Sequence, residues 1–433
     1  MISKRAIFLA ATGVLCIGSP LLAAQPADSR PLGDVVLVEG TPFKARIHSI
    51  DAKGMTAWHL PSGETKKSPL ADLCWWGEWR EPRASTQIVL VDGSLIVADV
   101  IAIDKEHLSA DWALGGEFKL PLESVGGILL APPVDRQGAD VLRFRLHGGD
   151  APSSNASTPA RSASEELPLN AHKAQNDSDR LILLNGDELA GEILSLDENT
   201  LKIRTAAGEM NIAKEKIAAV AFNPSLAAKP NSADARLWVG TSDGSRLLVS
   251  SLVIEVETAK LKFASGISLT LPAAKITAIQ PLAGRTTYLS DLKPAGYQQI
   301  PFLDLSWPYR ADRNVLGTQL RAGGKPFLKG LGMHSAARLT YKLERPYRTF
   351  SALAAIDDQT AGRGSAIFRV YLDDGSGNWQ LKFESPIVRG GAASVPIEVD
   401  LSGAKRLSLL VDFADRGDEQ AHADWLNARL LPQ

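Results

Sequence analysis

The sequence predicts an all-β protein. Short runs of aliphatic and β-branched residues follow one another along most of the chain, separated by Asp-Gly, Asn-Gly and Pro-containing turns. Glycine (36 residues) and proline (25 residues) are spread along the chain, which favours short strands and turns. A chain of 433 residues has room for two or three domains. We predict four small β-barrel-like repeats followed by a jelly-roll β-sandwich.

The first 24 residues are typical of a signal peptide. Lys4 and Arg5 precede an apolar run that Pro20 interrupts, and Ala23-Ala24 offers a small-residue cleavage site. A transmembrane anchor is the alternative, but the uninterrupted run is short for a membrane span. We expect a secreted, periplasmic or cell-envelope protein with no membrane span after cleavage of residues 1–24.

The overall charge argues against nucleic acid as a partner. The 47 Lys and Arg residues nearly balance the 49 Asp and Glu residues, whereas a nucleic-acid-binding protein needs a clustered basic surface. Removal of residues 1–24 would leave Cys74 as the sole cysteine, so no internal disulfide can form in the mature chain.

Four segments share one spacing of turns and aliphatic residues. In each segment, an acidic residue lies eleven positions after a glycine turn, and an aliphatic residue directly precedes this acidic residue. A second glycine and a final aliphatic residue follow. The first glycines are Gly40, Gly93, Gly186 and Gly244, and the aliphatic–acidic pairs are Ile50-Asp51, Ile103-Asp104, Leu196-Asp197 and Ile254-Glu255. This spacing indicates an internal repeat.

The repeats are predicted to be non-catalytic β modules. Residues 34–131 would hold two of them and residues 180–282 the other two, as small barrels or as one continuous β array. Residues 148–179 are rich in Ser, Ala, Pro and Asn and indicate a flexible linker. No repeat carries a catalytic motif, and Gly240-Thr241-Ser242-Asp243-Gly244 matches Gly-x-Ser-x-Gly on a hairpin turn where that motif does not function.

The last third of the chain resembles a known family. Seven short strand patterns between 339 and 431 favour a β-sandwich. Within this part, five short stretches are similar to successive motifs of the NPCBM domain, a carbohydrate-binding module that also accompanies family 98 glycoside hydrolases. They are KGLGMHS at 329–335, AIDD at 355–358, FRVYLDDG at 368–375, DLSGAKRL at 400–407 and HADWLNARL at 422–430.

The resemblance implies a galactose-binding-like β-sandwich over 285–433 that holds sugars in edge loops and performs no catalysis. Because a pyranose has an apolar face and a polar rim, its site needs a ring and hydrogen-bonding groups. We take His334, Asp358, Trp379 and Arg389 as candidate carbohydrate-binding residues, with His334 alternatively a structural histidine. Trp425 lies in a strand pattern and is expected in the core.

The resemblance also implies a structural Ca²⁺. Calcium takes six to eight oxygen ligands. Asp357, Asp412, Asp415, Asp418 and Asp424 are the candidate ligands, and ordinary solvated turn acids are the alternative.

The first functional hypothesis is a secreted, non-catalytic carbohydrate-binding protein. The sandwich would bind a glycan or cell-surface polysaccharide, and the repeats would be spacers or docking modules. The alternative is a structural or assembly protein of the cell envelope whose repeats bind envelope proteins. An unrecognised hydrolase is the weakest reading, since no stretch of the chain offers a catalytic motif in a suitable context.

Overall fold

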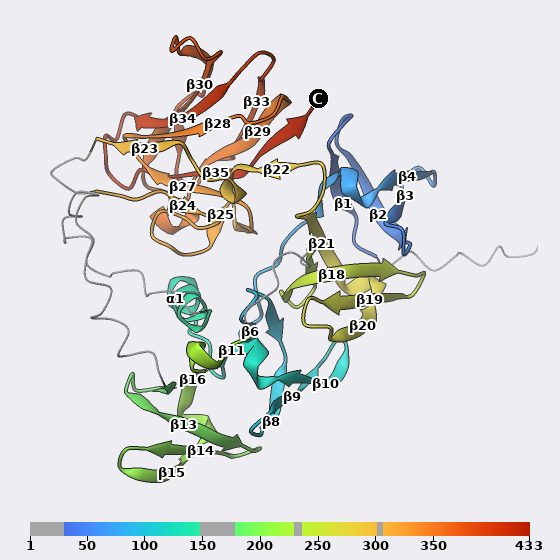
Figure 1. Ribbon diagram of the computed structural model, residues 1–433, viewed down its shortest axis with the longest axis vertical. Helices are drawn as coiled ribbons and strands as arrows, with labels where there is room; N and C mark the ends of the chain where they lie inside the picture. The colour runs from blue at the N-terminus through green and yellow to red at the C-terminus, as the bar shows by residue number, and fades with distance from the viewer. Residues whose placement is uncertain (1–29, 148–177, 229–235, 301–305) are drawn as a thin grey trace, which may run out of the picture.

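The computed structural model describes residues 30–147, 178–228, 236–300 and 306–433 (Figure 1). Within these ranges the protein is built of β-strands and a single α-helix, α1 (Arg136–Leu146), which confirms the all-β prediction. The predicted signal peptide, and the predicted linker apart from its last residues, lie outside the described ranges. In the described part of the chain, no helix combines the length and apolar character needed to cross a membrane.

Residues 33–77 form a small five-stranded unit, called unit 1 here. The first strand pairs with the second and the fifth, so the sheet curls back on itself around a core that includes Val35, Ile47 and Trp58. A 3-10 turn precedes the last strand. The elements are β1 (Gly33–Leu37), β2 (Phe43–Ile50), β3 (Met55–His59), β4 (Thr65–Pro69), η1 (Leu70–Asp72) and β5 (Leu73–Gly77).

Three further segments have a similar order of elements. Unit 2 (87–129) contains β6 (Gln87–Leu90), β7 (Leu95–Val97), β8 (Asp99–Ile103), β9 (His107–Trp112), β10 (Gly116–Pro121), η2 (Leu122–Ser124) and β11 (Val125–Leu129). Unit 3 (179–221) contains β12 (Asp179–Leu183), β13 (Glu188–Leu196), β14 (Thr200–Thr205), β15 (Gly208–Ala213), η4 (Lys214–Lys216) and β16 (Ile217–Ala221). Unit 4 (237–281) contains β17 (Leu237–Thr241), β18 (Arg246–Ile254), β19 (Thr258–Phe263), β20 (Ser268–Pro272), η6 (Ala273–Lys275) and β21 (Ile276–Pro281).

The units associate in two pairs through their last strands. β5 of unit 1 pairs antiparallel with β21 of unit 4, and β11 of unit 2 pairs antiparallel with β16 of unit 3. Equivalent residues face each other, because Trp76 lies opposite Ile279 and Ile128 opposite Val220. Each pair therefore has a local two-fold arrangement. The backbone groups at the edge strand of one unit form hydrogen bonds with those of the other unit.

Each pair of units has a second contact. It is made by the aliphatic residues that precede the regularly spaced acidic residues of the repeats. Ile50 lies opposite Ile254, and Ile103 opposite Leu196. All four side chains belong to one continuous core that runs through the units. The spacing seen in the sequence thus marks positions at which two units meet.

The C-terminal part is a β-sandwich, as predicted. One sheet has the strand order β24-β27-β35-β29-β33 with β22 beside β35, and the other has the order β23-β28-β34-β30-β31 with β32 beside β30. The strands are β22 (Thr287–Tyr288), β23 (Gly296–Gln299), β24 (Arg310–Ala311), β27 (Gly330–His334), β28 (Ala337–Lys342), β29 (Tyr347–Ile356), β30 (Ser365–Asp373), β31 (Gln380–Glu384), β32 (Val388–Arg389), β33 (Val395–Asp400), β34 (Arg406–Phe413) and β35 (His422–Pro432).

The core of the sandwich lies between its two sheets. Trp425 is fully buried there, with its ring centroid 5.0 Å from that of Phe368 and 6.2 Å from that of Phe350. The prediction that Trp425 is a core residue is confirmed. A separate hairpin, β25 (Leu320–Ala322) with β26 (Lys325–Phe327), projects from the sandwich on the side of the units (Figure 1).

Candidate functional site

The two ends of strand β30 separate the predicted sugar-binding residues. At one end Ser365 pairs with Arg389 and Ala366 pairs with Phe413, whereas at the other end Asp373 pairs with Arg406. At about 3.3 Å per residue, β30 places these ends roughly 26 Å apart.

Trp379 lies at the Asp373 end. It directly precedes β31, and the guanidinium of Arg406 lies 5.1 Å from the centroid of its ring. Arg406 in turn donates a hydrogen bond of 2.6 Å from Nε to Asp373. Trp379 therefore stands too far from the Arg389 end for one sugar to contact both, which corrects the predicted grouping of Trp379 with His334 and Arg389.

His334, Asp358 and Arg389 gather at the opposite end. His334 closes β27 opposite His422, the first residue of β35, and Asp358 follows β29 in the 3-10 turn η8 (Asp358–Thr360). The carboxylate of Asp358 accepts hydrogen bonds from the backbone N–H groups of Gly323 and Gly324. Arg389 forms an exposed ion pair with Asp415. Asp358 and Arg389 are thus already engaged by protein groups.

His334 forms the centre of an aromatic cluster that includes a residue missed in the sequence. Its imidazole stacks on the indole of Trp307 with a centroid distance of 4.7 Å and an interplanar angle of 6°. The ring of His422 lies 5.5 Å from that of His334 and 5.7 Å from that of Trp307. Trp307 lies in an irregular segment beside Pro308, so strand periodicity gave no signal, and only its type and loop position could have suggested it.

Burial favours the neutral form of both imidazoles in this cluster. Burial lowers the pKa of His422 to about 4, with a contribution from His334, and burial also lowers the pKa of His334. Nδ1 of His334 lies 2.8 Å from the Ser335 carbonyl oxygen and 3.2 Å from Oδ1 of Asp418. Since a carbonyl only accepts, Nδ1 carries the proton and donates to it. The contact with Asp418 is then a close approach of its carboxylate to an Nδ1 whose proton is directed to the Ser335 carbonyl.

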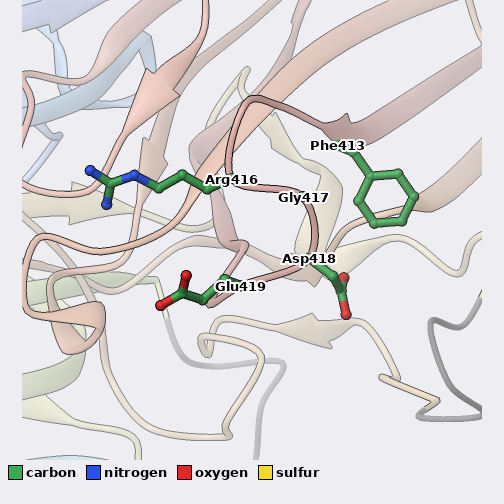
Figure 2. A pocket seen from close by; sticks show the side chains of 5 residues that line it. All are labelled: Phe413, Arg416, Gly417, Asp418 and Glu419. Carbon is green, nitrogen blue, oxygen red and sulfur yellow. The ribbon is translucent and has the colours of Figure 1, made fainter.

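A pocket of about 570 Å³ opens beside this cluster. It is lined by residues of the segment after β34, namely Phe413, Arg416, Gly417, Asp418 and Glu419. Figure 2 shows Phe413 and Asp418 on one side of the segment and Arg416 and Glu419 on the other. Asp418 links the pocket to His334, because its carboxylate contacts both His334 and the Ser335 hydroxyl. An aromatic ring beside charged hydrogen-bonding groups suits a ligand with an apolar face and a polar rim.

A comparison with protein families decides the identity of the sandwich, because residues 285–431 match the NPCBM/NEW2 domain. Residues 285–431 form an NPCBM/NEW2 domain. The family resemblance predicted from the sequence is thereby confirmed.

Two curated proteins share sequence with about a quarter of the chain. A Renibacterium salmoninarum protein named "Putative endo-alpha-N-acetylgalactosaminidase" is 37% identical over 115 residues, which are 27% of this chain and 7% of that protein. The alpha-1,3-galactosidase B of Akkermansia muciniphila is 30% identical over 122 residues, which are 27% of this chain and 15% of that protein. The chain thus corresponds to a small part of either relative.

Solved structures of carbohydrate-binding modules are also similar. The second family 51 module and INT domains of Clostridium perfringens ZmpB, solved with GlcNAc, share 27% identity with a TM-score of 0.30, covering 42% of this chain and 37% of that one.

Three of the five predicted calcium ligands of the NPCBM/NEW2 domain have separate partners. Asp412 forms an ion pair with Arg369, Asp415 with Arg389, and Asp418 contacts His334. Among the described residues there is no group of three or more His, Cys, Asp or Glu side chains that could hold a metal. Asp412 lies in strand β34, not in a loop as expected, and Asp415 and Asp418 lie in the segment after it. Each of the three acids faces a different partner, so they do not share one ion.

Asp357 and Asp424 are the two remaining candidates, and both are buried. Asp357 accepts hydrogen bonds from the backbone N–H groups of Gln359 and Arg321 and from the side-chain amide of Asn314. Neither carboxylate oxygen of Asp424 has a donor. Burial, and then the negative charge of Asp357, raise the pKa of Asp424 well above its ordinary value. A carboxyl pair in this state requires a proton or a cation, so the chemistry of Asp357 and Asp424 fits a cation.

Proposed function

We propose that this protein is an exported, non-catalytic glycan-binding protein whose NPCBM/NEW2 domain holds a sugar at the His334 end of the sandwich. The observation that carries the proposal is the pocket lined by Phe413 and Asp418 beside the stacked rings of Trp307 and His334. The names of the curated relatives supply the sugars to try first, which are galactose and N-acetylgalactosamine. Export rests on the pattern of residues 1–24.

The pocket suits binding more than catalysis. A glycosidase places two carboxyl groups across a cleft, one of them as an acid with a raised pKa. Here Asp418 accepts a hydrogen bond from the Ser335 hydroxyl and lies 3.2 Å from Nδ1 of His334, and we take its carboxylate as an acceptor for sugar hydroxyl groups. The ring of Phe413 supplies an apolar surface for the sugar face. Affinity from so few contacts should lie in the range of about micromolar to millimolar Kd.

Glycan-array binding by the full chain tests the site. Phe413→Ala and Asp418→Asn are each expected to weaken binding of a confirmed glycan by roughly ten- to a hundredfold, because each removes one contact at the centre of the pocket. Trp379→Ala is the matched control, since it removes an aromatic ring at the opposite end of the same sandwich, and it should bind as the parent does.

The glycan array also distinguishes this hypothesis from a site at the other end of the sandwich and from the envelope-assembly hypothesis. Loss of binding in Trp379→Ala with retention in both pocket variants would move the site to the Asp373 end. Binding of no glycan by the correctly folded parent would reject the proposal and leave the envelope-assembly hypothesis, in which the units bind protein.

We also propose that the structural Ca²⁺ implied by the family is held by Asp357 and Asp424. An ion there would compensate two buried carboxylates that have no cationic side chain. We expect the full chain to melt at a higher temperature in calcium than in chelator. When free calcium is a hundred times its Kd, the ion should raise the free energy of unfolding by about 2.7 kcal/mol.

Two isosteric variants sharpen the calcium test. Asp424→Asn should abolish the difference between calcium and chelator. Asp412→Asn alters an acid that is paired with Arg369, so the difference should persist. Equal melting temperatures of the parent in both conditions, with no calcium by elemental analysis, would reject the ion.

A further inference from the structure

The β25–β26 hairpin of the sandwich carries a buried arginine that contacts helix α1 and the connection between units 1 and 2. Arg321 is 7% exposed. Its guanidinium donates from Nη1 to Asp140 of helix α1 and from Nε to Glu81, which lies between units 1 and 2, both at 2.5 Å. A second hydrogen bond joins Nη2 to each of these carboxylates at 3.2 Å. Two acidic residues from outside the sandwich therefore form ion pairs with the same guanidinium.

Further buried groups extend this contact into units 2 and 4. Arg143 of α1 donates to Asp140 and to Gln87 of unit 2. Arg246 of unit 4 donates from Nη1 to Oε1 of Gln319, next to the hairpin, at 2.6 Å. Burial lowers the pKa of Arg246 to about 10, which leaves it charged at neutral pH. Charges this deeply buried are stable only while their partners stay in place.

The backbone of the same hairpin supports the sugar-binding end. The N–H of Arg321 donates to Asp357 at 3.0 Å, and those of Gly323 and Gly324 donate to Asp358 at 3.0 and 2.7 Å. The N–H of Asp357 donates to the carbonyl of His422, a member of the aromatic cluster. The hairpin thus contacts helix α1 and the segment between units 1 and 2 through its side chains, and the binding end through its backbone.

A second junction joins the sandwich to unit 1. The hydroxyl of Tyr288 donates to the carbonyl of Cys74 and accepts from Gln280, which also donates to Asn427. Val36, Val38 and Cys74 of unit 1 form one buried apolar cluster with Leu431 of the sandwich. Movement of the sandwich away from unit 1 would expose this cluster and break the buried hydrogen bonds.

We infer that the sandwich is not a module on a flexible tether but a fixed part of one cooperative body, with the β25–β26 hairpin setting the orientation of the sugar-binding end relative to the units. Release of the sandwich would leave Arg321 without either of its carboxylate partners, and Asp140 and Glu81 without its guanidinium, at the same time as it exposed the apolar cluster at unit 1. The inference does not depend on whether a sugar binds.

Differential scanning calorimetry of the full chain tests this inference. The parent should unfold the sandwich and the units in one transition. Arg321→Ala should lower the midpoint by roughly 5–10 °C or split off an earlier sandwich transition, because it removes the guanidinium that joins the sandwich to the buried Asp140 and the partly buried Glu81. Lys325→Ala is the matched control, since Lys325 pairs with Glu78 across the same interface but both side chains are largely exposed. Its midpoint should stay within about 1–2 °C of the parent.

A conservative variant keeps the test decisive if Arg321→Ala does not fold. Arg321→Lys retains the charge but loses the hydrogen bonds to both carboxylates. Its unfolding midpoint should therefore lie below that of the parent but above that of Arg321→Ala. A parent with two separate transitions, or Arg321 variants that melt like the parent, would overturn the inference.

Discussion

Trp425→Ala is expected to destabilise the sandwich by about 3–5 kcal/mol, the cost of removing a large aromatic side chain from a packed core. The side chain is fully buried and packs against Phe350 and Phe368, so its removal leaves a cavity that two sheets cannot close. Thermal unfolding followed by near-ultraviolet circular dichroism would measure the loss.

Two variants separate the cavity from other effects. Trp379→Ala removes the same kind of side chain from a half-buried position and should cost about 1 kcal/mol or less. Trp425→Phe should cost less than Trp425→Ala, because it retains a ring and removes an indole N–H that has no hydrogen-bond partner. A Trp425→Ala variant as stable as the parent would contradict the placement of this residue between the sheets.

Gly77→Ala is expected to disrupt the contact between units 1 and 4. Gly77 has a φ of 78° and pairs with Ala278 at the end of β5. A Cβ there would lie 2.0 Å from the carbonyl oxygen of Thr277, so the two last strands would have to separate. We expect a loss of several kcal/mol, since a conformational cost of about 1–2 kcal/mol adds to the broken strand pairing.

Gly54 provides the matched control, with the same φ of 78°. The nearest atom to a Cβ at Gly54 would be the Cβ of Leu70 at 3.8 Å, an ordinary contact. Gly54→Ala should therefore show the conformational cost alone, about 1–2 kcal/mol. Urea unfolding of both variants measures the difference, and equal losses would mean that the approach of unit 4 to Gly77 contributes nothing.

Local patterns predicted the elements that depend on neighbours along the chain. Glycine turns such as Gly40 and Gly93 adopt positive φ, as tight turns between strands require. The apolar run around Trp425 marked a core strand, and the five motifs of the last third marked the NPCBM/NEW2 domain. These features can be predicted from the sequence because turn conformation and strand periodicity are set by residues a few positions apart.

The site was predicted only in part, because its composition depends on which strand ends share one side of the sandwich. Trp379 follows a glycine-rich loop at the start of a strand pattern, and Trp307 lies in an irregular segment. Periodicity cannot tell which of them lies near His334. The antiparallel order of β27, β35 and β29 brings His334, His422 and Asp357 together, whereas the length of β30 carries Trp379 away. The acids separated for the same reason, as Asp412 and Asp415 met arginines from other strands.

Local residue patterns predicted that the chain consists mainly of β-strands, where its turns lie and that its last third is an NPCBM/NEW2 domain. Only the tertiary structure decided that unit 1 pairs with unit 4 and unit 2 with unit 3, and that Arg321 meets Asp140 and Glu81. Arg321 and Asp140 are 181 residues apart, and a lone arginine in a hairpin carries no mark of its partner. Pairing over such separations follows from the complementary shape and charge of whole surfaces, which exist only after each part has folded.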